Sequence, residues 1–258
     1  LLSFVPASPA AFLVDSIDFD IAHIAVAGSA LSAISIGAAC GDVTLRNSSF
    51  RFVGFRNDYG STATVSLLDI QSAAGLVLDR VDISAANSTD NGTEMDMYGI
   101  RSSSNMTGVT IANSFVSVGS VSASISTSET FGVYIQYYGT PVRIVGSTVS
   151  AGVYSNLVAN LSSSAIYVPS TSLVLTNNII VIDTRVQNNW AWRVNSARLG
   201  FLRNNCIATV SSIDLSSERF LQRTDNLSEY LWTTFQSSVP SASTNTCQSL
   251  SSLSLSYG

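Results

Sequence analysis

A recurring pattern of apolar residues constrains the fold of this 258-residue chain more than any other feature. The pattern is clearest between Gly108 and Val118, where Ile111 can be taken as position zero. Seven copies follow this alignment, with spacings of 31, 33, 33, 33, 31 and 27 residues between the zero positions Val14, Leu45, Leu78, Ile111, Ile144, Leu175 and Leu202. Self-similarity at such a period predicts a repeat architecture in which each copy stacks on the next.

Each copy encodes two short strands separated by a bend. An apolar residue stands two positions before zero, as Val109 does before Ile111, and the residue between them is polar or tolerates water. This period-two alternation is typical of a strand with one buried face. A third strand, such as Val133 to Ile135, precedes each unit from the second copy onward. A second apolar column follows five residues after zero, at Phe19, Phe50, Ile83, Val116, Val149, Ile180 and Ile207.

The bend between the two strands favours asparagine. Its second position is occupied by Ser16, Asn47, Arg80, Asn113, Gly146, Asn177 and Asn204. Asparagine tolerates the unusual backbone angles of a bend, and its amide can donate and accept hydrogen bonds along a stack of equivalent turns. We therefore predict a structural asparagine ladder at Asn47, Asn113, Asn177 and Asn204, with Asn47 buried in it.

The strand columns and the asparagine bend resemble those of the right-handed parallel β-helix superfamily, the fold of pectate lyases, phage tailspikes and many autotransporter passenger domains. This resemblance implies an all-β, right-handed parallel β-helix (β-solenoid) of about seven turns over residues 11–212. Residues 1–10 are expected to form an N-terminal lead-in that covers the first turn. Residues 213–258 are expected to form a short helical cap, between Ser216 and Phe235, and a Ser-rich tail. The scaffold supports many activities, so the resemblance predicts the fold and is nearly silent on function.

The composition narrows the range of partners. The net charge is −5, there is no lysine, and the twelve basic residues are all arginine without a basic cluster. Such a surface is not expected to bind nucleic acid or an anionic membrane. The apolar stretch 21–40 is long enough to suggest a membrane helix. It aligns with the end of one repeat and the start of the next, so no membrane span is predicted.

Catalytic groups are scarce in this sequence. It has one histidine and four glutamates, so a Ser-His-Asp triad, a histidine metal cluster and a lysine base are each poorly supplied. The acidic calcium ligands of pectate lyases and the motifs of polygalacturonases are not present. We predict no catalytic residues, no metal and no cofactor, and we lean away from an enzyme.

The most promising surface feature is an outward column on the strand that precedes each unit. Arginine and tyrosine at the 4.8 Å spacing typical of neighbouring strands are well placed for stacking and cation–π contacts, and for binding a sugar ring. In the alternative interpretation, the column only stabilises neighbouring strands or is covered by the tail or another subunit. The predicted glycan-binding residues are Asp69, Arg101, Tyr134, Tyr167 and Arg193, with Tyr137 and Tyr138 beside them.

Six inserts rich in turn-forming residues follow the second strands and are predicted as loops along one edge, a common position for a binding surface. They cover residues 22–33, 54–66, 86–98, 119–131, 152–164 and 183–190. Sequons at Asn87, Asn91 and Asn160 fall in these inserts and could carry glycan.

The three cysteines leave an odd one whatever pairs form. Cys206 and Cys247 are one candidate disulfide, and three unpaired thiols are the alternative.

The sequence favours an extracellular or cell-surface structural and adhesive β-solenoid. Its expected partner is a glycan, a surface protein or further copies of itself in fibres or oligomers. The alternative function is a polysaccharide lyase or glycoside hydrolase with the Arg/Tyr column in its groove.

Overall fold

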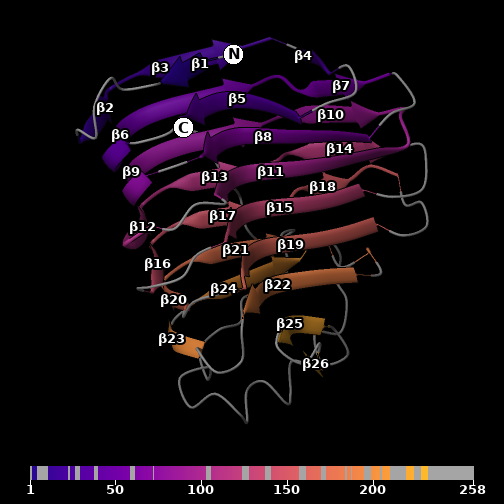
Figure 1. Ribbon diagram of the computed structural model, residues 1–258. Coiled ribbons are helices and arrows are strands. Elements are labelled where there is room, and N and C mark those ends of the chain that lie inside the picture. Colours follow the sequence, from indigo (N-terminus) through magenta and orange to yellow (C-terminus); the bar gives the residue numbers. More distant parts are fainter. Residues whose placement is uncertain are drawn as a thin grey trace.

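The computed structural model is a stack of β-strands arranged in three sheets around one long axis (Figure 1). No helix occurs in the described part of the chain, which confirms the all-β, parallel β-helix prediction. Accordingly, none of its elements is a helix long and apolar enough to cross a membrane. The structure describes residues 2–4, 11–22, 24–26, 30–37, 40–58, 62–71, 73–102, 106–123, 128–136, 141–156, 161–169, 173–183, 185–186, 188–194, 199–203, 205–209, 219–223 and 228–231.

The three sheets are named A, B and C here. Sheet A contains β1 (Leu2–Phe4), β5 (Ala30–Ile36), β8 (Thr62–Ile70), β11 (Glu94–Ser102), β15 (Ser128–Ile135), β19 (Leu161–Val168), β22 (Asn188–Val194), β25 (Arg219–Arg223) and β26 (Ser228–Leu231). Sheet B contains β2 (Phe12–Asp15), β3 (Asp18–Ile21), β6 (Cys40–Phe52), β9 (Ala73–Ala85), β12 (Gly108–Ala112), β13 (Phe115–Ser117), β16 (Val142–Val145), β17 (Thr148–Ser150), β20 (Leu173–Thr176), β21 (Ile179–Ile182), β23 (Leu199–Arg203) and β24 (Cys206–Thr209). Sheet C contains β4 (Ile24–Val26), β7 (Phe55–Asn57), β10 (Asn87–Asp90), β14 (Ser120–Ala123) and β18 (Val153–Tyr154).

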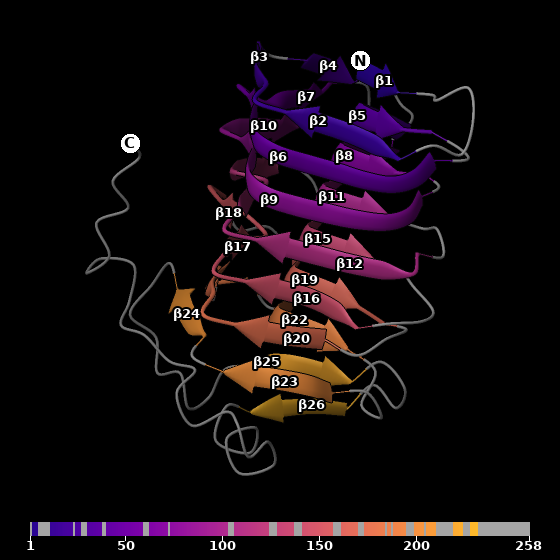
Figure 2. The same cartoon turned by 90° about the vertical axis from the view of Figure 1, so that its left-hand side faces the viewer.

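The sequence repeat corresponds to the strand register of sheet B. The first sheet B strand of each turn faces the viewer in Figure 2, from β2 at the top to β23. The zero positions pair with one another in parallel, from Val14 with Leu45 through Ile111 with Ile144 to Leu175 with Leu202. From Leu45 to Leu175 these side chains are fully buried. The apolar columns therefore form one continuous core along the axis, and burying them drives the stacking of the turns.

The bend in sheet B is a left-handed backbone position. Positive φ angles occur at Ser16 (58°), Asn47 (48°), Arg80 (55°), Asn113 (50°), Gly146 (59°) and Asn177 (57°). The predicted burial of Asn47 is wrong, because its side chain is exposed and its amide donates to Asp15 Oδ1 at 3.0 Å. Asn113 is also exposed and donates to Asp79 Oδ1 at 3.1 Å, and Asn177 is exposed as well. The residue at the bend is therefore selected for its backbone angles, and Asn204 lies outside the described residues.

A buried polar ladder does run along the stack, one residue after the predicted position. Ser147 Oγ accepts the Ser114 N–H at 3.1 Å, and Asn178 Oδ1 accepts the Ser147 N–H at 2.9 Å. Asn205 Oδ1 in turn accepts the Asn178 N–H at 3.2 Å and the Asn178 amide at 2.9 Å. At the bend these backbone N–H groups cannot all reach the next strand, so inward side chains satisfy them.

The predicted edge loops are in large part a third sheet, which is a correction. Their Ser- and Asn-rich segments form the strands of sheet C and the first residues of several sheet A strands. Polar residues can enter the interior here because they bond one another or the backbone: Asn57 donates to Asp90 at 3.0 Å, and Ser88 accepts the Phe55 backbone N–H at 3.2 Å. A polar segment of the sequence can therefore be mistaken for a loop although it forms a strand.

The number of complete turns is also smaller than predicted. Four turns, from β2 to β15, contribute a strand of at least three residues to every sheet, and in the next turn sheet C has only the two residues of β18. The described structure thus has about four complete turns rather than seven. The spacing falls to 27 residues at the last repeat, which leaves less chain for the third sheet there.

Sheet A continues as strands at both of its ends, and its C-terminal end differs from the predicted helical cap. In the N-terminal lead-in, β1 pairs with β5 and extends the sheet. At the other end, β25 pairs with β22, and β26 returns antiparallel to β25, where short helices were predicted. The open backbone edge of β22 offers hydrogen bonds that outweigh a weak helical spacing of apolar residues. The rest of residues 213–258 lies outside the described residues.

Candidate functional site

The predicted column lies on sheet A as successive partners in the strand register. Asp69 pairs with Arg101, Arg101 with Tyr134, Tyr134 with Tyr167, and Tyr167 with Arg193. Arg101, Tyr134 and Tyr167 are half-buried side chains on the outer surface. Tyr137 and Tyr138 lie outside the described residues. The register therefore assembles the column from five strands.

The tyrosine rings stack on each other along the axis. Tyr134 and Tyr167 have ring centroids 5.0 Å apart and planes only 22° from parallel. A second pair, Tyr98 and Phe131, is stacked at 4.9 Å and 9°, and Tyr134 meets both of these rings edge-on at 5.4 Å. Because the faces pack against neighbouring rings, a ligand meets mainly ring edges and phenol oxygens. This geometry favours the stabilising interpretation of the column more than the open sugar platform.

Two charged members of the predicted column, Arg101 and Asp69, have partners within the protein. The Arg101 guanidinium carbon lies 5.2 Å from the centroid of the Tyr98 ring, a cation–π distance. Asp69 is buried, and its Oδ2 accepts from the Ser32 hydroxyl at 3.1 Å and from the Gln71 amide at 3.4 Å. Arg101 is half-buried beside the Tyr98 ring and still reaches the surface, whereas the buried Asp69 bonds within the protein.

A row of acidic residues borders the aromatic rings. Asp96 lies two residues before Tyr98, and its Oδ1 accepts the backbone N–H of Glu129 on the next strand at 3.2 Å. Glu129 Oε1 accepts the Ser162 hydroxyl at 3.0 Å. Burial, and then the nearby charge of Glu94, raises the pKa of Asp96 to about 6. Burial and the Asp96 charge also raise the pKa of Tyr98, so this phenol keeps its proton and can donate a hydrogen bond.

Sequence reasoning missed four residues of this surface: Asp96, Tyr98, Glu129 and Phe131. A signal was present, because an aromatic residue stands three positions before both Arg101 and Tyr134, with glycine next to it. Both glycines are needed where the strands pack closely on the core. A Cβ on Gly99 would lie 2.5 Å from the Gly132 oxygen, and one on Gly132 would lie 2.7 Å from the Ala165 oxygen.

We call this surface the sheet A face; it consists of Asp96, Tyr98, Arg101, Glu129, Tyr134 and Tyr167, whose three tyrosine rings pack against the buried Phe131. It presents carboxylates, aromatic edges with phenols, and a guanidinium in three adjacent rows across three neighbouring strands. Such a surface can exchange hydrogen bonds with a ligand rich in hydroxyl groups.

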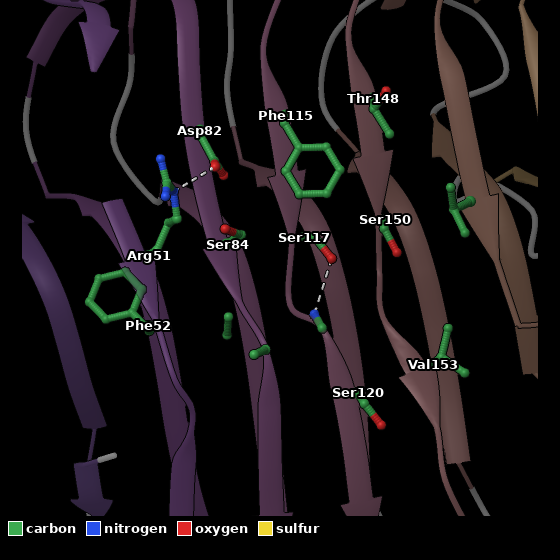
Figure 3. A pocket seen from close by; sticks show the side chains of 14 residues that line it. Arg51, Phe52, Asp82, Ser84, Phe115, Ser117, Ser120, Thr148, Ser150 and Val153 are labelled. Carbon is green, nitrogen blue, oxygen red and sulfur yellow. Dashed lines mark hydrogen bonds and ion pairs between the residues drawn. The ribbon is translucent and has the colours of Figure 1, made fainter. Parts of the chain in front are cut away.

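A groove of about 600 Å³ lies on a different side, where sheet B turns toward sheet C (Figure 3). Its floor includes Ser84, Ser117 and Ser150 on successive strands, and Phe115 stands beside them. Among the described residues, the only charges that line it are Arg51 and Asp82, which form an ion pair at 3.3 Å. The groove is therefore suited to an uncharged ligand, since its guanidinium and carboxylate are paired with each other.

The remaining predictions concern glycosylation sites, a disulfide and metal binding. Asn87 begins strand β10 and Asn91 follows it, and both side chains are exposed, whereas Asn160 lies outside the described residues. Cys206 begins β24, and Cys247 lies outside the described residues, so their pairing remains a prediction. Among the described residues, no group of three or more histidine, cysteine, aspartate or glutamate side chains is close enough to hold a metal ion.

Fold and surface together define a parallel β-helix with a polar and aromatic face on one sheet. Comparison of the chain with protein-family models, with curated proteins and with solved structures finds no match. The functional argument therefore depends on the geometry of the sheet A face.

Proposed function

We propose that this protein is an extracellular structural and adhesive β-solenoid that binds a glycan on the sheet A face. The observation that carries the proposal is the side-by-side arrangement of Asp96 and Glu129, the aromatic rings, and Arg101. Carboxylates accept hydrogen bonds from sugar hydroxyls, while a guanidinium and phenols donate them. The rigid strands beneath hold these groups in fixed positions, which lowers the entropic cost of binding.

The ring stacking defines how a glycan would be bound. Since Tyr134 and Tyr167 share their faces, at a centroid distance of 5.0 Å, contact with a ligand depends on their phenol oxygens and ring edges. Binding at such a surface is expected to be weak for one sugar unit. A polymer that crosses several turns would gain from repeated contacts.

A glycan-array screen with matched variants tests this proposal. Tyr134→Phe/Tyr167→Phe keeps the stacked rings and removes both hydroxyls, and Thr44→Ala/Thr110→Ala on sheet B serves as the control. We expect the Phe variant to lose at least about tenfold in affinity, from two hydrogen bonds to the ligand at about 1 kcal/mol each. Unchanged binding by the Phe variant, or no binding by the unmodified chain, would refute the proposal.

A second candidate function, glycoside hydrolysis, is favoured by the carboxyl pair on the same face. Asp96 has a pKa raised to about 6, suitable for a general acid, and Glu129 is the ionisable neighbour on the next strand. Glycans retained by the protein should then become shorter over time. Asp96→Asn and Glu129→Gln should each abolish shortening while binding persists, whereas intact glycans in every case favour the adhesive function.

A further inference from the structure

The first turn of the solenoid leaves its core side chains half exposed. Phe19, Ile21, Ile24 and Leu31 are only partly buried, although they occupy columns that are sealed in the turns below. Phe50, directly beneath Phe19, is 1% exposed, and the next residues of that column are fully buried. This N-terminal end of the stack lies at the top of Figure 1, at β3 and β4. It is an apolar surface that another strand could cover.

The backbone at this end is open as well. In the described part of the chain, β3 pairs only with β6, and β4 pairs only with β7. The Ile17 and Ile21 carbonyls accept the N–H groups of Ser49 and Val53 below, at 2.7 and 2.8 Å. In a parallel strand alternate residues bond to opposite sides, so Asp18 and Asp20 direct their backbone N–H and C=O groups away from β6. Unpaired groups of this kind are a template for a further strand.

The charges at this end select the kind of strand that fits. The side chains of Asp18 and Asp20 are exposed, and neither forms an ion pair among the described residues. On the lower side, Asp20 has Arg51 as its register partner. A second copy docked end to end through β3 would place aspartates opposite aspartates, which is destabilising. A segment with apolar residues toward the core and arginine or lysine outward has the complementary charge.

We propose that the N-terminal end of the stack binds an extended peptide segment with alternating apolar and basic residues, which adds a strand to β2 and β3. The apolar side chains would cover Phe19 and Ile21, and the basic side chains would pair with Asp18 and Asp20. This inference is independent of the glycan proposal, because the sheet A face lies on β11, β15 and β19 and not at the end of the stack.

A peptide with the sequence of residues 43–53 is a suitable probe. Its segment already pairs with β2 and β3 from below, and it carries Arg46 and Arg51 at outward positions. Labelled peptide is titrated against the intact chain and followed by fluorescence anisotropy. The control peptide has both arginines replaced by glutamate and keeps the apolar residues.

Two protein variants separate the contributions of charge and backbone. Asp20→Asn should weaken binding about two- to fivefold, the effect expected of the one cross-strand charge pair with Arg51 of the peptide, since Ser49 stands opposite Asp18 in this register. Asp20→Pro removes an upward N–H without touching the bonds to β6, and should weaken binding by at least tenfold while circular dichroism stays unchanged. Equal affinity for the glutamate peptide, normal binding by a folded Asp20→Pro variant, or no peptide binding by the unmodified chain would overturn the proposal. Sedimentation that showed dimers through this end would also overturn it.

Discussion

Two neighbouring asparagines offer a direct test of how the turns are held together. Asn177 and Asn178 are adjacent in the sequence, but the first side chain is exposed and the second is 1% exposed. Asn178 accepts the Ser147 N–H at 2.9 Å and donates to the Ile144 oxygen at 2.8 Å and to Asn205 Oδ1 at 2.9 Å. Asn177 has a φ of 57°, so its role is to adopt the bend.

Alanine should therefore have very different costs at the two positions. Asn178→Ala removes three hydrogen bonds, each with a net contribution of about 1 kcal/mol, and leaves a buried N–H without a partner, so we expect a loss of about 3–4 kcal/mol. Asn177→Ala keeps the Cβ but removes the short polar side chain that helps asparagine adopt the left-handed region, at a cost of about 1 kcal/mol. Asn177→Gly should be close to neutral, because glycine adopts this region freely.

Urea unfolding followed by tryptophan fluorescence measures these differences, since Trp190 and Trp192 are buried in β22. Hydrogen exchange of the Ser147 amide supplies a local measurement, and it should lose protection in Asn178→Ala alone. Equal destabilisation by the two alanine substitutions, or a loss below about 1 kcal/mol for Asn178→Ala, would refute the assignment of the buried ladder.

Two further predictions concern ionisable groups. The rise in the pKa of Asp96 from 3.8 to about 6 favours the protonated carboxyl in the folded state, so stability should fall as the pH rises from about 4 to about 6 and then level off. The effect is at most about 3 kcal/mol, reduced to about 1–2 by solvent screening, and it should vanish in Asp96→Asn during urea unfolding across this pH range. Arg185 donates to the fully buried Asp183 through Nε at 2.9 Å and Nη2 at 2.8 Å. Arg185→Ala should cost about 3 kcal/mol in thermal or urea unfolding, and adding Asp183→Asn should recover part of the loss; no recovery would contradict an uncompensated charge as the cause.

The fold could be predicted because the same apolar positions recur in every copy, so residues about 30 positions apart must pack together. Every copy has an apolar residue at zero and another five residues later, and burial of those columns requires the same register in each turn. Sheet C could not be found this way, because its inward residues include Asn57, Ser88 and Asp90, which hydrogen-bond to partners one turn away that the local sequence does not reveal.

The candidate site was predicted in part for a similar reason. The register of Arg101, Tyr134 and Tyr167 follows directly from the repeat, so the column itself was accessible to sequence reasoning. The orientation of the rings was not, because it depends on Tyr98 and Phe131, which meet Tyr134 edge-on. The asparagine ladder was displaced by one residue because the sequence shows which amino acids recur but not which side of the backbone they occupy.

The left-handed bend gives the molecule a fixed corner around which its length can vary. The five residues from zero to the second column are constant in all seven copies, whereas the copies themselves are spaced from 27 to 33 residues apart. Insertions and deletions are therefore accommodated away from this corner, in the connections to sheets A and C. A chain built in this way can gain or lose whole turns, each adding about 4.8 Å to its height, while the corner and the core beside it stay in phase.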